Sequence, residues 1–142
     1  MRILFCCSFL LLASLIKAQH SVDLTLEAPV GKGTILIAVY GSEADFDQNE
    51  NAVQSAKVSV SKVGTYNTRL TDLPSGKYVI ALFQDVNDNG KLDTNFLGIP
   101  KEPYAFSRSP KSKWRAPRYE EVVFELTQSE KMKLVLKKWK NR

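Results

Sequence analysis

Apolar and polar residues alternate along most of this chain, which is the pattern of a β-strand with one buried face. The clearest case is "VDLTLEA" at 22–28, where valine and leucines alternate with aspartate, threonine and glutamate. Similar alternation runs over 56–62 and 130–138. Past the first 18 residues, no segment keeps a helical period for more than two turns. The pattern therefore predicts a β protein.

Two further segments, "TILIAVY" (34–40) and "YVIALF" (78–83), are apolar on both faces, as in central strands that are covered on both sides or flanked by long loops. Segments 66–73 and 121–126 complete a set of seven strands. Short strands with turn signals between them indicate an all-β, antiparallel, Ig-like sandwich of about seven strands. The expected core residues are Ile35, Ile37, Val39, Val58, Ile80, Leu82, Phe124 and Leu134.

The N-terminal segment 1–18 is typical of a signal peptide, with Arg2, an apolar run over 3–16 and Ala18 at its end. The run is shorter than the roughly 20 residues that span a bilayer. Cleavage after Ala18 would leave one domain, 19–142, without cysteine. We expect an exported protein, periplasmic or secreted to the cell surface, with no stable membrane insertion after cleavage.

Charge and composition limit the classes of function and partner that are expected for this protein. Without Arg2 and Lys17 the mature chain has 18 basic and 15 acidic residues, a net charge of +3 that does not favour nucleic acid as a partner. The one histidine, His20, lies next to the expected mature terminus, where we expect disorder. Because we expect the mature chain to have no cysteine and no folded histidine, we predict that it is non-catalytic. We expect its partner to be an unknown protein or glycan at the cell envelope.

Two long connections interrupt the strands: an acidic one at 41–55, and a loop of 33 residues at 86–118 that holds four of the six prolines. Loops this long in a compact domain are usually functional or disordered. The second follows the strand at 78–83 and opens with "DVNDNGKLDTN" (85–95), in which oxygen-bearing side chains recur at alternate positions.

That spacing is typical of a calcium loop of the EF-hand type, in which alternate residues project oxygens and a glycine at the sixth position permits a sharp turn. Gly90 is at the sixth position. The candidate ligands are the side chains of Asp85, Asn87, Asn89 and Asp93 and the main-chain carbonyl of Lys91.

The twelfth position is Phe96, where the full motif has a glutamate, so the site in 85–96 needs a closing carboxylate from elsewhere. The candidates are Asp45, Asp47 and Glu50 in the acidic connection. With two certain carboxylates, Ca²⁺ would bind weakly, with a dissociation constant of about 10⁻⁴–10⁻³ M. The alternative is that "DNGK" (88–91) is simply the Asn-Gly turn of a hairpin.

The stretch "DLPSGKYVIALFQDVNDNGKLDTNFLGIPKEPYAFS" (72–107), with the later "APRYEEVVFEL" (116–126), resembles the exported bacterial domain-of-unknown-function family numbered 2141. The resemblance implies an exported, transthyretin-like or Ig-like β-sandwich and no established activity. Gln84 stands where the family usually has histidine, and Pro103 and Ala105 replace glycines. A site that used this histidine would be altered here.

Aromatic side chains in the long loop suggest a second function, a carbohydrate-binding module, because rings on an exported sandwich can stack on sugars. The candidates are Phe96, Tyr104, Phe106 and Trp114. The alternative is that the rings pack the loop onto the sheet, which we favour for Phe96 and Phe106. The hypothesis that we place first is a binding or structural module stabilised by the weak calcium site in 85–96.

Overall fold

The computed structural model describes residues 18–111 and 115–139, so all but the last residue of the predicted signal peptide lies outside it. The elements in chain order are β1 (Gln19–Ala28), β2 (Thr34–Tyr40), α1 (Glu43–Gln48), β3 (Gln54–Ser59), β4 (Gly64–Pro74), β5 (Gly76–Asp85), β6 (Tyr104–Phe106), α2 (Tyr119–Val122), β7 (Phe124–Leu126) and β8 (Glu130–Val135). Strands predominate, as the alternating pattern predicts.

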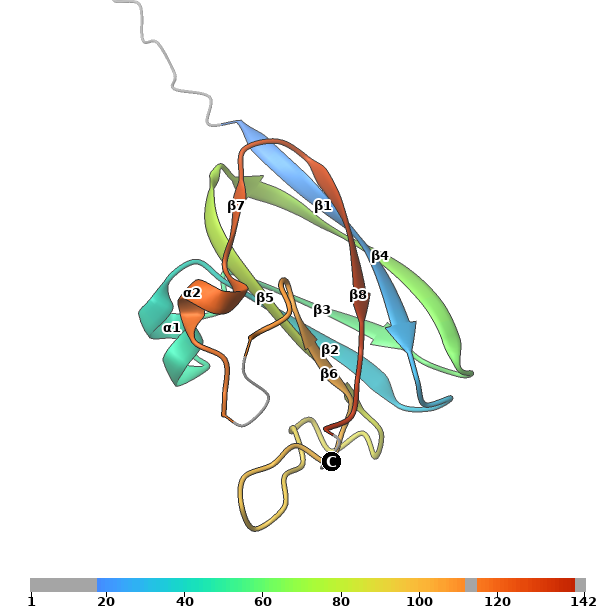
Figure 1. The fold of residues 1–142 in the computed structure, drawn as a ribbon. Coiled ribbons are helices and arrows are strands. Elements are labelled where there is room, and N and C mark those ends of the chain that lie inside the picture. Colours follow the sequence, from blue (N-terminus) through green and yellow to red (C-terminus); the bar gives the residue numbers. More distant parts are fainter. Residues whose placement is uncertain (1–17, 112–114, 140–142) are drawn as a thin grey trace, which may run out of the picture.

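The strands form two sheets, one of order β4-β1-β8 and one of order β3-β2-β5-β6 with β7 also paired to β5 (Figure 1). The predicted all-β sandwich is confirmed, with eight strands among the described residues instead of about seven. One pairing departs from the antiparallel prediction, because β8 runs parallel to β1, with Leu26 opposite Leu134. The finer Ig-like or transthyretin-like assignment stays a prediction.

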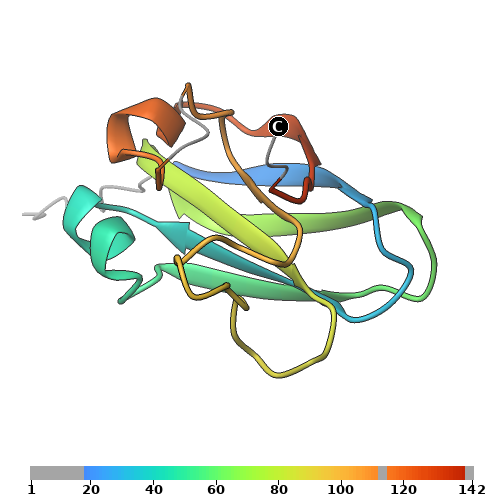
Figure 2. The ribbon, with the colours of Figure 1, turned by 60° about the horizontal axis from the view of Figure 1, so that its bottom comes forward.

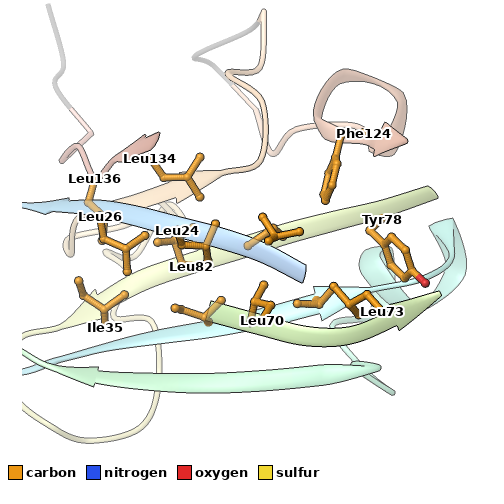
Figure 3. Close-up of a cluster of buried hydrophobic side chains, with 14 of the residues drawn as sticks. Leu24, Leu26, Ile35, Leu70, Leu73, Tyr78, Leu82, Phe124, Leu134 and Leu136 are labelled. Atoms are coloured by element: carbon orange, nitrogen blue, oxygen red, sulfur yellow. The ribbon is translucent and has the colours of Figure 1, made fainter. Parts of the chain in front are cut away.

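The core lies between the two sheets and contains side chains from both (Figure 3). All eight predicted core residues belong to one cluster; seven are buried, and Val58 is partly buried at its edge. The cluster also holds Leu24 and Leu26 of β1 and Leu70 of β4. Alternation along the sequence is thus a reliable guide to which face of each strand is inward.

The two long connections contain regular structure that the pattern did not predict. The acidic connection contains α1, whose N-terminus is capped by the Ser42 hydroxyl. The predicted strand at 121–126 is wrong in its first half, since α2 occupies 119–122 and only β7 is extended. The long loop contributes β6 to the edge of β5. The strands predicted at 56–62 and 130–138 end earlier, at Ser59 and Val135.

A second, smaller cluster explains why β2 and β5 are apolar on both faces. Phe46 of α1 and Val122 of α2 pack with Tyr40 and Val79 on the side of the sheet that faces away from the main core. The two helices lie beside each other in both views (Figures 1 and 2). They cover one end of this outer face.

Candidate functional site

The candidate calcium loop begins at Asp85, the last residue of β5, which pairs with Thr34 at the start of β2. The loop leaves the end of β5 and projects below the strands in both views (Figures 1 and 2). Asp85 is buried, with 2% of its surface exposed. Its Oδ1 accepts a hydrogen bond from the Asn89 main-chain N–H at 3.1 Å, and its Oδ2 accepts one from Gly90 at 2.6 Å. Gly90 has a φ of +78°, the left-handed conformation that the sharp turn requires.

The other predicted ligands are brought together around Asp93. Its two carboxylate oxygens accept hydrogen bonds from the side-chain amides of Asn87 at 2.7 Å and Asn89 at 3.0 Å. The Oδ1 atoms of these asparagines accept main-chain N–H groups of Asn89 and Lys91 at 3.3 and 2.9 Å. Four oxygen-bearing side chains therefore share one compact loop, closed by hydrogen bonds between its own members.

This donor set fits a hard cation in part. Two carboxylates, two amide oxygens and a carbonyl are the oxygen ligands that Ca²⁺ takes. To bind an ion, the amides of Asn87 and Asn89 would have to leave the Asp93 carboxylate and turn their oxygens inward. Within residues 18–111 and 115–139, no group of three or more His, Cys, Asp or Glu side chains is arranged to hold a metal.

The structure does not bring the predicted closing carboxylates to the loop. Asp45 and Asp47 are on α1, which follows the far end of β2 from Asp85, and Glu50 comes just after that helix. The Asp45 carboxylate instead accepts hydrogen bonds from the Ser42 hydroxyl and the Asn51 amide, at 2.5 and 3.1 Å, and these bonds lower its pKa. Its role is to stabilise the start of α1.

Glu102 is the carboxylate that the fold does bring to the loop. It is 5% exposed, and it accepts main-chain N–H groups at both ends of the candidate site, from Val86 at 2.7 Å and from Asp93 at 3.0 Å. The Asp93 carbonyl accepts a third bond, from Lys101 N–H, at 2.8 Å. The sequence pattern did not point to Glu102, because its partners are 9 and 16 residues away.

The turn between β1 and β2 supports the base of the loop. The Gln84 side-chain amide donates to the carbonyls of Val30 and Lys32 at 2.6 and 2.8 Å, and Gln84 is fully buried. At Gly33, whose φ is +89°, a Cβ atom would lie 2.1 Å from the Asp85 carbonyl oxygen. Gln84 therefore holds this turn in place through its side-chain amide.

Asp88, at the fourth position of the loop, is not one of the predicted ligands, and its side chain bonds to a residue outside the loop. Its Oδ1 accepts a hydrogen bond from the Thr34 hydroxyl at 2.9 Å. Thr34 lies at the start of β2, so this bond ties the tip of the Asn-Gly turn to the sheet. The arrangement makes Asp88 a useful comparison residue for Asp85.

The loop aromatics do not form one common face. Phe96 is 94% exposed at the loop tip, so the expectation that it packs on the sheet is wrong. Phe106 does pack, edge to face, against Phe46 at 6.1 Å and Tyr104 at 5.9 Å between ring centroids. Trp114 lies outside the described residues.

An open hollow of about 940 Å³ lies on the outer face of the sheet, beside the loop. Tyr40, Tyr104 and Phe106 are among the residues of the sheet that line it, and Leu97 and Pro117 line it from the long loop. Burial raises the pKa of the Tyr40 and Tyr104 phenols, as expected where rings are partly withdrawn from water. The hollow could not be predicted from the sequence, because its lining residues come from segments far apart in the chain.

One rim residue, Arg115, is fixed by an ion pair. Its guanidinium donates two hydrogen bonds to the Glu121 carboxylate, both at 2.9 Å. These bonds, helped by the Arg118 main-chain N–H, lower the pKa of Glu121 from 4.5 to about 2. The pair ties the segment before α2 to the helix.

The expectation that His20 is disordered is wrong. It lies in β1 opposite Leu73, and its Nε2 is 2.8 Å from the Ser75 hydroxyl oxygen. Disorder of His20 is therefore no argument against Ser–His chemistry. The absence of catalysis stays a prediction. His20 is at the start of β1 and the candidate loop follows the end of β5, so the histidine is not part of that site.

Comparison with known proteins yields one match. A family model described as "Uncharacterized protein conserved in bacteria (DUF2141)" matches residues 27–133. No curated protein and no solved structure matches the chain. In the described ranges, neither helix has the length and apolar character needed to cross a membrane.

Proposed function

Since the chain belongs to the bacterial family DUF2141, whose description assigns no activity, we propose from its own residues that it is an exported, non-catalytic binding or structural module. In this proposal, the loop at 85–96 holds a weakly bound Ca²⁺. The observation that carries it is the gathering of Asp85, Asn87, Asn89 and Asp93 in one compact loop whose first carboxylate is buried. The ion would order the start of the long connection without taking part in chemistry.

Export is supported by the start of the first strand. β1 begins at Gln19, so cleavage after Ala18 would leave every strand of the sandwich intact. The protein recovered from its native host should begin near Gln19 when its intact mass is measured. A full-length chain retained in the membrane fraction would contradict export with cleavage.

Calcium binding is tested by thermal unfolding in Ca²⁺ and in chelator at matched ionic strength. A ligand that binds only the folded state stabilises it by RT ln(1 + [L]/Kd), about 1.4 kcal/mol at tenfold excess over Kd. We therefore expect a rise in Tm at about 10 mM Ca²⁺, given a Kd of about 1 mM. Mg²⁺ should substitute poorly, because it requires tight octahedral geometry and gives up water reluctantly.

Asp85→Ala should abolish the calcium-dependent rise, because it removes the buried carboxylate at the first position. Asp93→Asn provides the same test with less disturbance, since it keeps the shape and removes one charge. Asp88→Ala is the matched control, and it should keep the rise even if loss of the Thr34 bond lowers the Tm in both buffers. Equal melting curves for the wild-type protein with and without calcium would leave the Asn-Gly hairpin turn as the better interpretation.

The carbohydrate-binding alternative receives less support. Of its four aromatic residues, Tyr104 and Phe106 line the hollow, whereas Phe96 points to solvent at the loop tip. A sugar site needs several polar groups that converge on hydroxyls, and the described lining of the hollow is mainly apolar. Glycan binding is therefore kept as a competing outcome in the test that follows.

A further inference from the structure

The outer face of the sheet carries a second feature, a hollow that borders the calcium loop at Lys91 and Leu92. Six side chains of β2, β5 and β6 form the floor of the hollow: Leu36, Ala38, Ala81, Phe83, Tyr104 and Phe106. All six are half-buried although they face away from the main core. An aliphatic and aromatic floor of this kind favours an apolar ligand surface.

The long connection borders this floor at two places. Leu92, Leu97 and Ile99 come from its first half, and Pro117 comes from its end, just before α2. The tip at Leu97 is ordered by Asn95, whose Oδ1 accepts main-chain N–H groups of Leu97 and Ile99 at 2.9 and 3.0 Å. The volume of about 940 Å³ is at the upper end of the range for small-molecule sites, roughly 300–1,000 Å³.

The charged residues that line the hollow have one sign. They are Lys91 and Arg115, and no Asp or Glu is among the lining residues that the structure describes. Arg115 is neutralised by Glu121, whereas the exposed Lys91 ammonium has no ion-pair partner within the described ranges. A rim cation above an apolar floor is complementary to a molecule with an apolar body and one anionic end.

We propose that this hollow binds an anionic amphiphile, with the acyl chain on the floor formed by β2, β5 and β6 and the acidic head group near Lys91. The chain would displace water from aliphatic and aromatic surface, which supplies most of the affinity. The head group would remain at the rim, where it is still hydrated and meets the lysine. A glycan would find few polar partners on the same floor.

The test uses the folded mature chain and dansyl-undecanoic acid, a fluorescent acyl carboxylate, below its micelle concentration and in chelator. Chelator prevents calcium soaps and separates this test from the calcium proposal, since neither result depends on the other. We expect a saturable rise in dansyl fluorescence. Dodecanoate should displace the probe best, uncharged dodecanol less well, and dodecyltrimethylammonium least.

Two variants locate the site on the floor and the rim. Ala81→Glu places a carboxylate among the apolar residues of the floor and should weaken binding by at least about tenfold. Leu97→Glu changes a rim residue that is 67% exposed, so folding is not at risk, and it should weaken binding several-fold. The matched control is Asn67→Glu, an exposed position on β4 of the other sheet, which should bind as the wild type does.

A lysine pair tests the head group. Lys91→Gln should weaken dodecanoate binding by about threefold and leave dodecanol unchanged, because one exposed charge contributes a fraction of a kcal/mol. Lys101→Gln, at an exposed lysine that does not line the hollow, should change neither. The Lys91 effect should shrink as salt is added.

Several results would overturn the proposal. The wild-type chain could fail to bind the probe saturably, or dodecyltrimethylammonium could compete as well as dodecanoate. Ala81→Glu and Leu97→Glu could both retain full affinity. Calorimetric binding of a cello-oligosaccharide in the absence of dodecanoate binding would replace the amphiphile with a glycan.

Discussion

Removal of the Glu102 carboxylate should destabilise the protein, because this one side chain binds the main chain at both ends of the loop. Glu102 is 5% exposed and accepts the main-chain N–H groups of Val86 and Asp93, at 2.7 and 3.0 Å. These donors lie on either side of the Asn-Gly turn, so one side chain fastens both ends of the candidate site.

The size of the effect follows from those two bonds. A hydrogen bond to a charged group contributes about 1.5–3 kcal/mol, and a buried donor left without a partner costs about 1–3 kcal/mol. Val86 and Asp93 are partly exposed, so water can replace some of the loss. We therefore expect Glu102→Ala to lower the free energy of unfolding by about 2–4 kcal/mol. Glu102→Gln should cost about half as much, since it keeps one acceptor and places an amide against the other N–H.

Urea unfolding gives the free energy, and amide hydrogen exchange shows where it is lost. Exchange should accelerate at Val86 and Asp93 in Glu102→Ala, and less so in Glu102→Gln. Glu50→Ala is the matched control, because Glu50 is exposed after α1, and it should remain within about 0.5 kcal/mol of the wild type. Unchanged stability and exchange in Glu102→Ala would refute the role assigned to this carboxylate.

Two further predictions concern the core and the acid range. Leu82→Ala should cost about 2–5 kcal/mol in urea unfolding because Leu82 is 3% exposed, whereas Leu97→Ala, at 67% exposure, should cost less than about 0.5 kcal/mol; similar losses would contradict the core assignment. The pKa of Glu121 is lowered to about 2 in the folded protein, so its contribution to stability is present above pH 4.5 and is lost as the pH falls towards 2. The midpoint of urea unfolding should therefore fall less steeply between pH 4.5 and 2 in Glu121→Gln than in the wild type. An equal dependence of this midpoint on pH in the two proteins would show that the Arg115 contact does not survive in solution.

The sequence by itself determined the class of the fold and most of its core. Alternation with period two reports which side chains of a strand share a face, and burial requires those faces to meet. All eight predicted core residues consequently lie in one cluster. The sequence also indicated which side chains meet in the loop. Asp85, Asn87, Asn89 and Asp93 form hydrogen bonds with residues no more than six positions away in the chain.

Only the tertiary structure decided how these parts were combined. The parallel pairing of β1 with β8 joins segments more than 100 residues apart, and the period of a strand carries no record of its partner. α1 and α2 have six and four residues, too short for a helical period, and they are stabilised by packing Phe46 and Val122 against the sheet. Glu102 binds main-chain N–H groups at both ends of the loop, and the apolar outer face is bordered by loops to form a hollow. Both features arise because folding brings distant segments of the chain together. Such contacts depend on three-dimensional distance, which local sequence does not encode.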